Sequence, residues 1–158
     1  MLTIVRTDST NPDFRALVKM LDADLAERDG EAHIFYAQFN KIENLRHVVV
    51  AYEDGIPVGC GALKEYEPGT MEVKRMFVPP AHRKNGIARR VLSELERWAE
   101  ELSCTRCILE TGKKQPEAIA LYKKSEYSVI PNYGQYAGVE NSVCFEKRIN
   151  PGGGTGEK

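Results

Sequence analysis

A short basic segment, Arg83-Lys84-Asn85-Gly86-Ile87-Ala88-Arg89-Arg90, combines residue types and spacing that suit the binding of a phosphate or pyrophosphate. It lies where a helical pattern begins, and the first backbone N–H groups of a helix lack intrahelical partners and carry the positive end of its dipole. Gly86 lets the backbone approach an anion closely, and the small Ala88 lets the first turn pack tightly. The segment therefore predicts a local anion site, although a solvated loop followed by an exposed basic helix face would have the same composition.

The charge of the whole chain indicates that any anion site must be local. The chain has 158 residues, of which 42% are hydrophobic and 28% charged, and this profile is typical of one globular domain. Its 22 Lys and Arg residues against 23 Asp and Glu residues give a net charge of −1, which argues against nucleic acid or an anionic membrane as a partner. Residues 1–10 lack a signal-peptide pattern, and no apolar run of about 18 residues follows. These features predict a cytoplasmic protein.

Two other kinds of chemical site are not supported by the sequence. Cys104 and Cys107 form a single C-x-x-C pair with no histidine nearby, so neither zinc binding nor redox chemistry is expected, and Cys107 is predicted to be a buried strand residue. The string Thr111-Gly112-Lys113-Lys114 lacks the first glycine and the hydroxyl of a P-loop, and no G-x-G-x-x-G follows an early strand.

The first half of the chain predicts a strand, one or two helices and an antiparallel meander. A strand at 2–5 is followed by Asn11-Pro12-Asp13, which supplies a helix cap, a first-turn proline and an acidic residue. The apolar repeat of this helix stops at Gly30, and a second, weaker helix is expected at 31–40. Three strands are expected next, at 47–52, 56–63 and 71–78, with turns at Asp54-Gly55 and Pro68-Gly69. Gly59 and Gly61 predict the close approach of another backbone.

The second half predicts alternating helices and strands. The expected elements are a long amphipathic helix from about residue 85, a strand at 106–111, a helix from Gln115-Pro116-Glu117, and strands at 127–130 and 142–146. The strand–helix–strand unit at 71–111 must place its two strands parallel. We therefore expect a mixed α/β sheet in a single domain at 1–149, followed by a flexible Gly-rich tail at 150–158.

Two blocks of this sequence carry a family resemblance. Residues 71–88, MEVKRMFVPPAHRKNGIA, resemble the acyl-CoA-binding signature of the GNAT superfamily of N-acetyltransferases, in which V-x-P ends a strand and R/Q-x-x-G-x-G/A opens a helix. AIALYKKSEY, at 118–127, is similar to the family's second block, A-x-x-L-Y-x-x-x-G-F, with Glu126 in place of its glycine. Gln115 stands where the family often has Asn. The resemblance implies a GNAT-type fold: an antiparallel N-terminal meander and a β-α-β-α-β C-terminal half with splayed central strands.

The resemblance also implies acetyl-CoA as cosubstrate and no metal. By this resemblance the loop residues that would hold the CoA pyrophosphate are Arg83, Lys84, Asn85, Gly86, Ile87, Ala88 and Arg89. The backbone of Met76, Phe77 and Val78 would pair with the pantetheine amides, and one of these N–H groups would stabilise the developing oxyanion.

Two residues are candidates for proton transfer. Aminolysis of a thioester needs a neutral amine and a proton donor for the leaving thiolate. Glu72 lies where family members often carry a catalytic base, while an ion pair with Lys74 is the structural alternative and Glu110 is the second candidate base. Tyr122 matches the family tyrosine that protonates the thiolate, and a core aromatic residue is its alternative role.

The acceptor site is the part of the enzyme that the sequence describes least. The early helices and the final strands usually form it in this fold, and they offer His33, Tyr36, Gln38 and Phe39 on one side and Tyr133, Tyr136 and Asn141 on the other. Their aromatic and amide character favours a small amine or amino acid as acceptor. A protein lysine or N-terminal acetyltransferase and a catalytically silent CoA-binding module remain alternatives. Dimers are common among similar proteins, so the resemblance leaves a homodimer open, and the sequence does not fix the oligomeric state.

Overall fold

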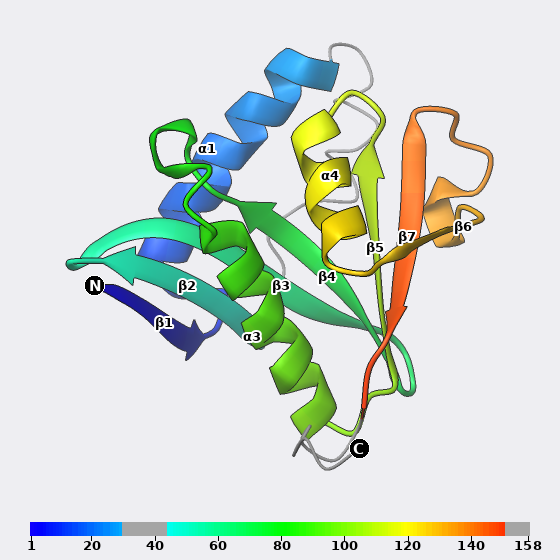
Figure 1. The fold of residues 1–158 in the computed structure, drawn as a ribbon, viewed down its shortest axis with the longest axis horizontal. Helices are drawn as coiled ribbons and strands as arrows, with labels where there is room; N and C mark the ends of the chain where they lie inside the picture. Colours follow the sequence, from blue (N-terminus) through cyan, green and yellow to red (C-terminus); the bar gives the residue numbers. More distant parts are fainter. Residues whose placement is uncertain (30–43, 151–158) are drawn as a thin grey trace. The chain divides into compact units, whose positions relative to one another are not determined.

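The computed structural model of the chain describes residues 1–29 and 44–150. In chain order the elements are β1 (Leu2–Thr7), α1 (Pro12–Asp29), β2 (His47–Glu53), β3 (Ile56–Glu67), β4 (Thr70–Phe77), η1 (Pro80–His82), α3 (Ile87–Glu101), β5 (Arg106–Gly112), α4 (Pro116–Lys124), β6 (Ser128–Ile130), η2 (Gly134–Tyr136) and β7 (Ser142–Arg148) (Figure 1). The helix expected at 31–40 and all of the expected tail except Asn150 lie outside the described residues. None of the helices in the described ranges is long and apolar enough to cross a lipid bilayer.

The strands form a mixed sheet in the order β1-β2-β3-β4-β5-β7-β6. β1 and β2 pair antiparallel, as do β2 and β3, whereas β4 and β5 pair parallel and β7 runs antiparallel to both β5 and β6. The β4–β5 register covers only Thr70–Glu72 against Arg106–Ile108, although both strands are longer. The predicted mixed α/β fold is confirmed, and the short parallel pairing agrees with splayed central strands.

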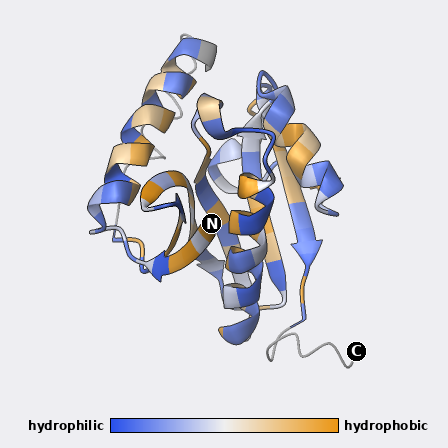
Figure 2. Ribbon diagram, turned by 60° about the vertical axis from the view of Figure 1, so that its left-hand side comes forward, coloured by the Kyte–Doolittle hydropathy of each residue, from blue (hydrophilic) through white to orange (hydrophobic). Residues whose placement is uncertain are grey.

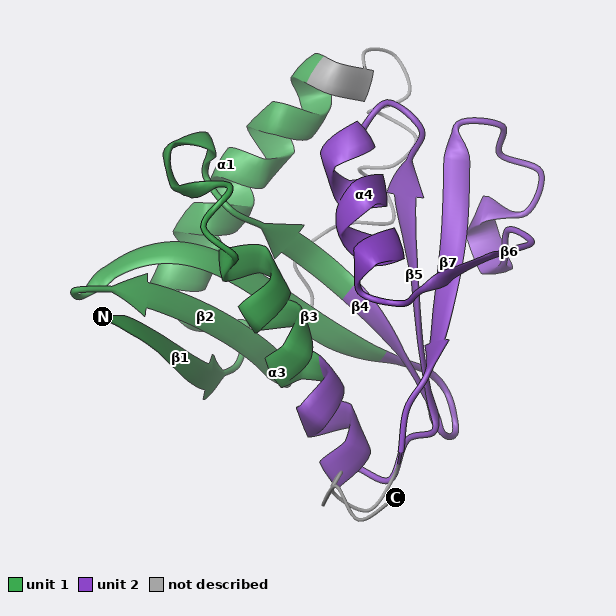
Figure 3. Ribbon diagram, in the orientation of Figure 1, with its two compact units in different colours: residues 1–64, 74–95 green, residues 65–73, 96–158 purple. Residues whose placement is uncertain are grey.

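The chain divides into two compact units. The first contains Met1–Lys64 and Lys74–Leu95, and the second contains Glu65–Val73 and Glu96–Lys158 (Figure 3). Strand β4 is shared, because its first residues belong to the second unit and Lys74 begins the part that belongs to the first.

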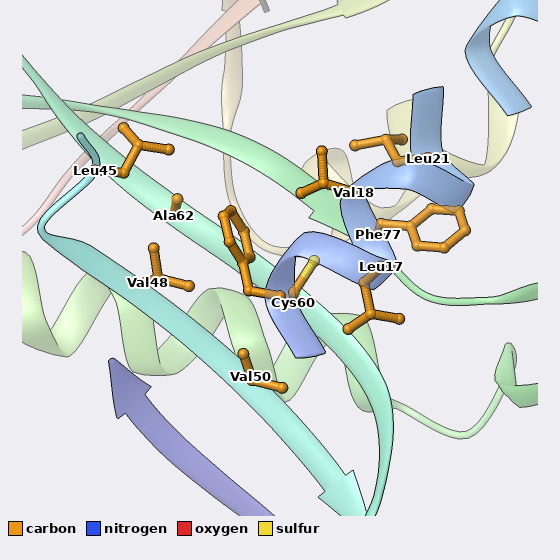
Figure 4. Packing of buried hydrophobic residues seen from close by; sticks show 10 residues of the cluster. Leu17, Val18, Leu21, Leu45, Val48, Val50, Cys60, Ala62 and Phe77 are labelled. Atoms are coloured by element: carbon orange, nitrogen blue, oxygen red, sulfur yellow. The ribbon is translucent and has the colours of Figure 1, made fainter. Parts of the chain in front are cut away.

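The core of the first unit forms where α1 packs on β2 and β3. Asn11 Oδ1 accepts a hydrogen bond from the Phe14 N–H at 2.9 Å, so the predicted cap starts this helix. Figure 2 shows the helices banded in orange and blue, as amphipathic helices should be. Figure 4 shows the labelled side chains of α1 to the right of those of the two strands, and the cluster consists of Phe14, Leu17, Val18, Leu21, Leu45, Val48, Val50, Cys60, Ala62 and Phe77.

The glycines of β3 make room for α3 in the same unit. A Cβ on Gly59 would lie 2.8 Å from Ile87 Cγ2, and a Cβ on Gly61 would lie 2.8 Å from Leu95 Cδ1. The expected close approach is therefore real. Its tightest contacts are made by side chains of α3 and by Met76 Sδ of β4, 2.6 Å from the Gly61 position, while the Phe77 backbone carbonyl lies 3.6 Å from the Gly59 position. Since residues alternate across a strand, Cys60 and Ala62 are left for the face that α1 covers.

Candidate active site

The basic loop lies in the first unit and leads directly into α3. Gly86 has φ +77°, a left-handed conformation that other residues adopt at a cost, and a Cβ built on it would meet no atom within 4 Å. Its carbonyl accepts a hydrogen bond from the Arg90 N–H at 3.1 Å, so the helix begins at once after the glycine. Lys84, Arg89 and Arg90 are exposed. The loop thus combines open space beside its glycine, exposed cations and the first N–H groups of a helix, an arrangement that fits a phosphate group.

Arg83 holds this loop against the end of β4. Its Nε donates a hydrogen bond of 2.6 Å to the Val78 carbonyl, and its guanidinium carbon lies 5.7 Å from the centre of the Phe77 ring. These contacts use one donor of Arg83 within the chain. Of the backbone groups expected to pair with pantetheine, the Val78 carbonyl is therefore already occupied.

Arg75 interrupts the regular backbone of β4 just before Met76. Its φ of +60° is left-handed, which costs a residue with a side chain about 1 kcal/mol. The Arg75 carbonyl accepts a hydrogen bond from the Cys60 thiol at 3.4 Å, and its buried guanidinium donates to Asp22 on α1 at 2.9 Å. An irregularity of this kind next to a site reorients the strand that carries it. The sequence contains no glycine here that could have predicted it.

Glu72, the predicted base, is a buried carboxylate on the part of β4 that belongs to the second unit. Its exposed fraction is only 6%, and it pairs in register with Ile108 of β5. Its Oε2 accepts a hydrogen bond of 2.7 Å from the Tyr133 hydroxyl. This partner differs from the Lys74 ion pair that was the structural alternative.

Glu110, the second candidate base, belongs to the same group of side chains. The Ser142 hydroxyl donates to its Oε2 at 2.7 Å. Burial raises the pKa of Tyr136 well above its ordinary value, and the charges of Glu110 and then Glu72 add to this rise. Burial likewise raises the pKa of the Cys144 thiol to about 11, with both carboxylates contributing. We call Glu72, Glu110, Tyr133, Tyr136 and Cys144 the carboxylate cluster.

The properties of Cys144 exclude one kind of chemistry in this cluster. A thiol whose pKa is about 11 remains protonated at neutral pH. Since the thiolate is the nucleophilic form, Cys144 is not activated as a nucleophile.

Tyr122, the predicted proton donor, is buried on α4 in the second unit. Burial raises its pKa well above the ordinary tyrosine value, and the charge of Glu110 raises it further. Its ring centre lies 5.9 Å from those of Tyr127 and Phe145. Glu110, a member of the carboxylate cluster, is thus also an electrostatic neighbour of Tyr122. A phenol that keeps its proton suits a donor, and its packing also suits the core role.

The other predicted residues have different outcomes. His33, Tyr36, Gln38 and Phe39 lie outside the described residues. Cys107 is fully buried, as predicted, and burial raises the pKa of its thiol to about 12. Within residues 1–29 and 44–150 no group of His, Cys, Asp and Glu side chains is arranged to hold a metal ion.

The Tyr133–Glu72 hydrogen bond is the contact that sequence reasoning missed. Tyr133 was a candidate only for the acceptor site, and the two residues are 61 positions apart. No local pattern links them, because β5 separates β4 from β7 in the sheet, and the loop before β7 meets Glu72 only in the folded chain. A tyrosine between Pro131-Asn132 and Gly134 is the one available signal, and it predicts a turn rather than a partner.

Comparisons with known proteins agree with the fold. Residues 13–127 match the model of the acetyltransferase (GNAT) family. A protein from Azospirillum brasilense named IAA acetyltransferase is 32% identical over 156 residues, covering 94% of this chain and 98% of that protein.

Solved structures give the same result. A Klebsiella pneumoniae structure described as an acyl-CoA N-acyltransferase has a TM-score of 0.79 and 30% identity, covering 94% of this chain and 98% of that one. A Salmonella typhimurium structure described as an acetyltransferase with acetyl-CoA shares the fold, with a TM-score of 0.68, 16% identity and 96% coverage of both chains. The protein is therefore an acyl-CoA-dependent N-acyltransferase by class. It belongs to the acetyltransferase (GNAT) family, as the two sequence blocks predict.

Proposed function

We propose that this protein transfers the acetyl group of acetyl-CoA to a primary amine of a small molecule or amino acid, by direct attack in a ternary complex. The observation that carries the proposal is the buried carboxylate of Glu72, fixed by a 2.7 Å hydrogen bond from Tyr133. A module that only bound CoA would need the basic loop but not this carboxylate. Family membership supplies the reaction class.

The basic loop is the proposed cosubstrate site. The open space at Gly86 and the unpaired N–H groups at the start of α3 fit a pyrophosphate, and Lys84, Asn85, Ile87, Ala88 and Arg89 complete the proposed set. Arg83 would hold the loop in place through Val78. Acetyl-CoA, when bound, supplies an activated thioester, and this chemistry requires no metal.

Proton transfer is the proposed task of two residues in the second unit. Glu72 would take a proton from the ammonium group of the acceptor and release it to solvent, so that the neutral amine attacks the thioester carbon and the carbon–sulfur bond breaks. Tyr122 would give its proton to the departing thiolate. The second proton, which the nitrogen loses as the amide forms, would leave through Glu72, and solvent would return one proton to Tyr122. Burial raises the pKa of Tyr122, so its hydroxyl carries a proton throughout the neutral range.

A small acceptor is supported by two observations. The carboxylate cluster contains tyrosines and two carboxylates, groups that recognise an ammonium ion. The relative from Azospirillum brasilense is named for IAA and not for a protein substrate. Acetylation of protein lysines or N-termini is the second candidate, since it would use the same chemistry.

Thiol release from acetyl-CoA tests this proposal. We would compare four small acceptors, tyramine, spermidine, phenylalanine and aspartate, with a lysine-containing peptide whose N-terminus is blocked. The proposal predicts that at least one small amine raises thiol release well above that of acetyl-CoA alone. Release with the peptide only would favour the protein acetyltransferase. Tight binding of acetyl-CoA by calorimetry without release by any acceptor would favour the silent module.

A further inference from the structure

We propose that Tyr133 is the positioning residue for Glu72, and that it determines which carboxylate oxygen accepts the proton of the acceptor amine. This inference rests on the proposed role of Glu72 as the base. The Tyr133 hydroxyl donates to Oε2 at 2.7 Å, so Oε2 is engaged and Oε1 is the oxygen assigned to the proton. A buried carboxylate needs such a donor, because burial without one is costly.

Aromatic contacts within the second unit fix the ring of Tyr133. Its centre lies 5.1 Å from that of Tyr66 at an interplanar angle of 72°, and 5.8 Å from that of Tyr136 at 90°. Both are the edge-to-face arrangement that aromatic rings prefer. Gly134, at φ +52°, brings the backbone close to Tyr66, and a Cβ there would lie 3.5 Å from the Tyr66 hydroxyl. The phenol is therefore held from two sides.

Hydrogen bonds fix the loop that carries Tyr133, between β6 and β7. Asn132 Nδ2 donates to the carbonyls of Val139 at 3.0 Å and Ser142 at 3.2 Å, which ties the start of the loop to its end. The Tyr136 N–H donates to the Tyr133 carbonyl at 2.9 Å and closes the turn of η2. A side chain on such a loop can orient a reacting group, because the hydrogen bonds of the loop already fix its own position.

The environment of Tyr133 also keeps its proton in place. Burial is the main cause that raises the pKa of this tyrosine, and the charge of Glu72 and their hydrogen bond raise it further. The hydroxyl therefore keeps its proton, and remains a donor, throughout the neutral range. Glu72 can thus accept the proton of the amine without competition from Tyr133.

Tyr133→Phe tests the inference, because it removes the hydroxyl and keeps the ring against Tyr66 and Tyr136. The probes are acetyl-CoA with the fastest of the four small amines, and acetyl-CoA alone, for which water is the acceptor. We expect kcat to fall about 10-fold with an unchanged KM for acetyl-CoA, while Glu72→Gln lowers kcat about 100-fold or more. In the Glu72→Gln background, Tyr133→Phe should cause no further loss.

Tyr52→Phe is the matched control. The Tyr52 hydroxyl also donates to a carboxylate at 2.7 Å, that of Asp13 in the first unit, so the same kind of bond is removed from a residue that is not part of the carboxylate cluster. Its kcat should equal that of the wild type, and circular dichroism should show all variants folded.

The possible failures are distinguishable. Wild-type turnover of Glu72→Gln would refute the assigned base and the inference with it. A slow Glu72→Gln with a normal Tyr133→Phe would leave the proposed function standing and overturn the inference alone. Fully additive losses in the double variant would also overturn it, because Tyr133 would then act independently of Glu72.

Discussion

At the scale of single residues, the proton-transfer groups are distinguished by their surroundings rather than by their types. Glu72 and Glu110 are both carboxylates beside tyrosines, yet Glu72 is held by a phenol and Glu110 by a serine hydroxyl. Tyr122 shares Glu110 as a neighbour and is enclosed by two aromatic rings. Because the ring makes the packing contacts, removing only the hydroxyl oxygen distinguishes a catalytic role of Tyr122 from a role in the core.

Tyr122→Phe removes that atom, the hydroxyl oxygen, and preserves the contacts of the ring with Tyr127 and Phe145. If Tyr122 protonates the leaving thiolate, kcat should fall about 10- to 100-fold, whereas the free energy of unfolding should change by less than about 1 kcal/mol. Steady-state kinetics and urea unfolding of the same preparation measure both quantities. An unchanged kcat would assign Tyr122 to the core alone.

At the scale of elements, the end of α4 explains one departure from the family pattern. Glu126 has φ +74°, and the N–H groups of Glu126 and Tyr127 donate to the carbonyls of Lys123 at 3.2 Å and Tyr122 at 3.0 Å. These two bonds form a Schellman motif, whose left-handed position usually carries glycine. At the other end of the helix, Gln115 makes no side-chain cap hydrogen bond. This chain therefore has an intact but strained helix end at the position where the family has glycine.

Glu126→Gly should relieve this strain and raise the free energy of unfolding by about 1 kcal/mol. Glu126→Ala is the control, because it also removes the carboxylate but keeps the Cβ that makes the conformation costly. Thermal or urea unfolding of both variants measures the difference. Equal stabilisation by alanine and glycine would contradict the backbone explanation and point to the charge instead.

At the scale of the whole molecule, the sequence predicted what depends on local patterns and missed what depends on distant contacts. The capped start of α1, the Asp54-Gly55 turn and the parallel β4–β5 pair follow from nearby residues, and all are present. The Tyr133–Glu72 bond joins residues 61 positions apart, so no periodicity could indicate it. The left-handed conformation of Arg75 was missed for a similar reason, because the contacts that offset its strain are with Asp22 and Cys60, which are distant in sequence.

The buried thiols make the free energy of unfolding fall as the pH rises through the alkaline range. Burial raises the pKa of Cys60 and of Cys107 from 9.0 to about 12, so between these values the folded chain binds more protons than the unfolded chain. Their contribution is complete below pH 9 and is lost as the pH rises, at roughly 1 kcal/mol per thiol for each pH unit.

Urea unfolding at pH 8, 9 and 10 measures this loss. Cys60→Ala should reduce the slope of the free energy of unfolding against pH by about the contribution of one thiol, whatever the substitution does to stability at pH 8. A free energy of unfolding that stays constant from pH 8 to 10 would contradict the assignment of both thiols as buried and protonated.

The acetylated product tests the central claim most directly. Wild-type protein, Glu72→Gln and Glu110→Gln would each be incubated with acetyl-CoA and the small-amine panel, and the amines analysed by mass spectrometry. We predict an N-acetylated amine with the wild type, formed about 100-fold or more slowly by Glu72→Gln and with a smaller loss in Glu110→Gln. Thiol release without any acetylated amine, or a larger loss in Glu110→Gln than in Glu72→Gln, would contradict the account.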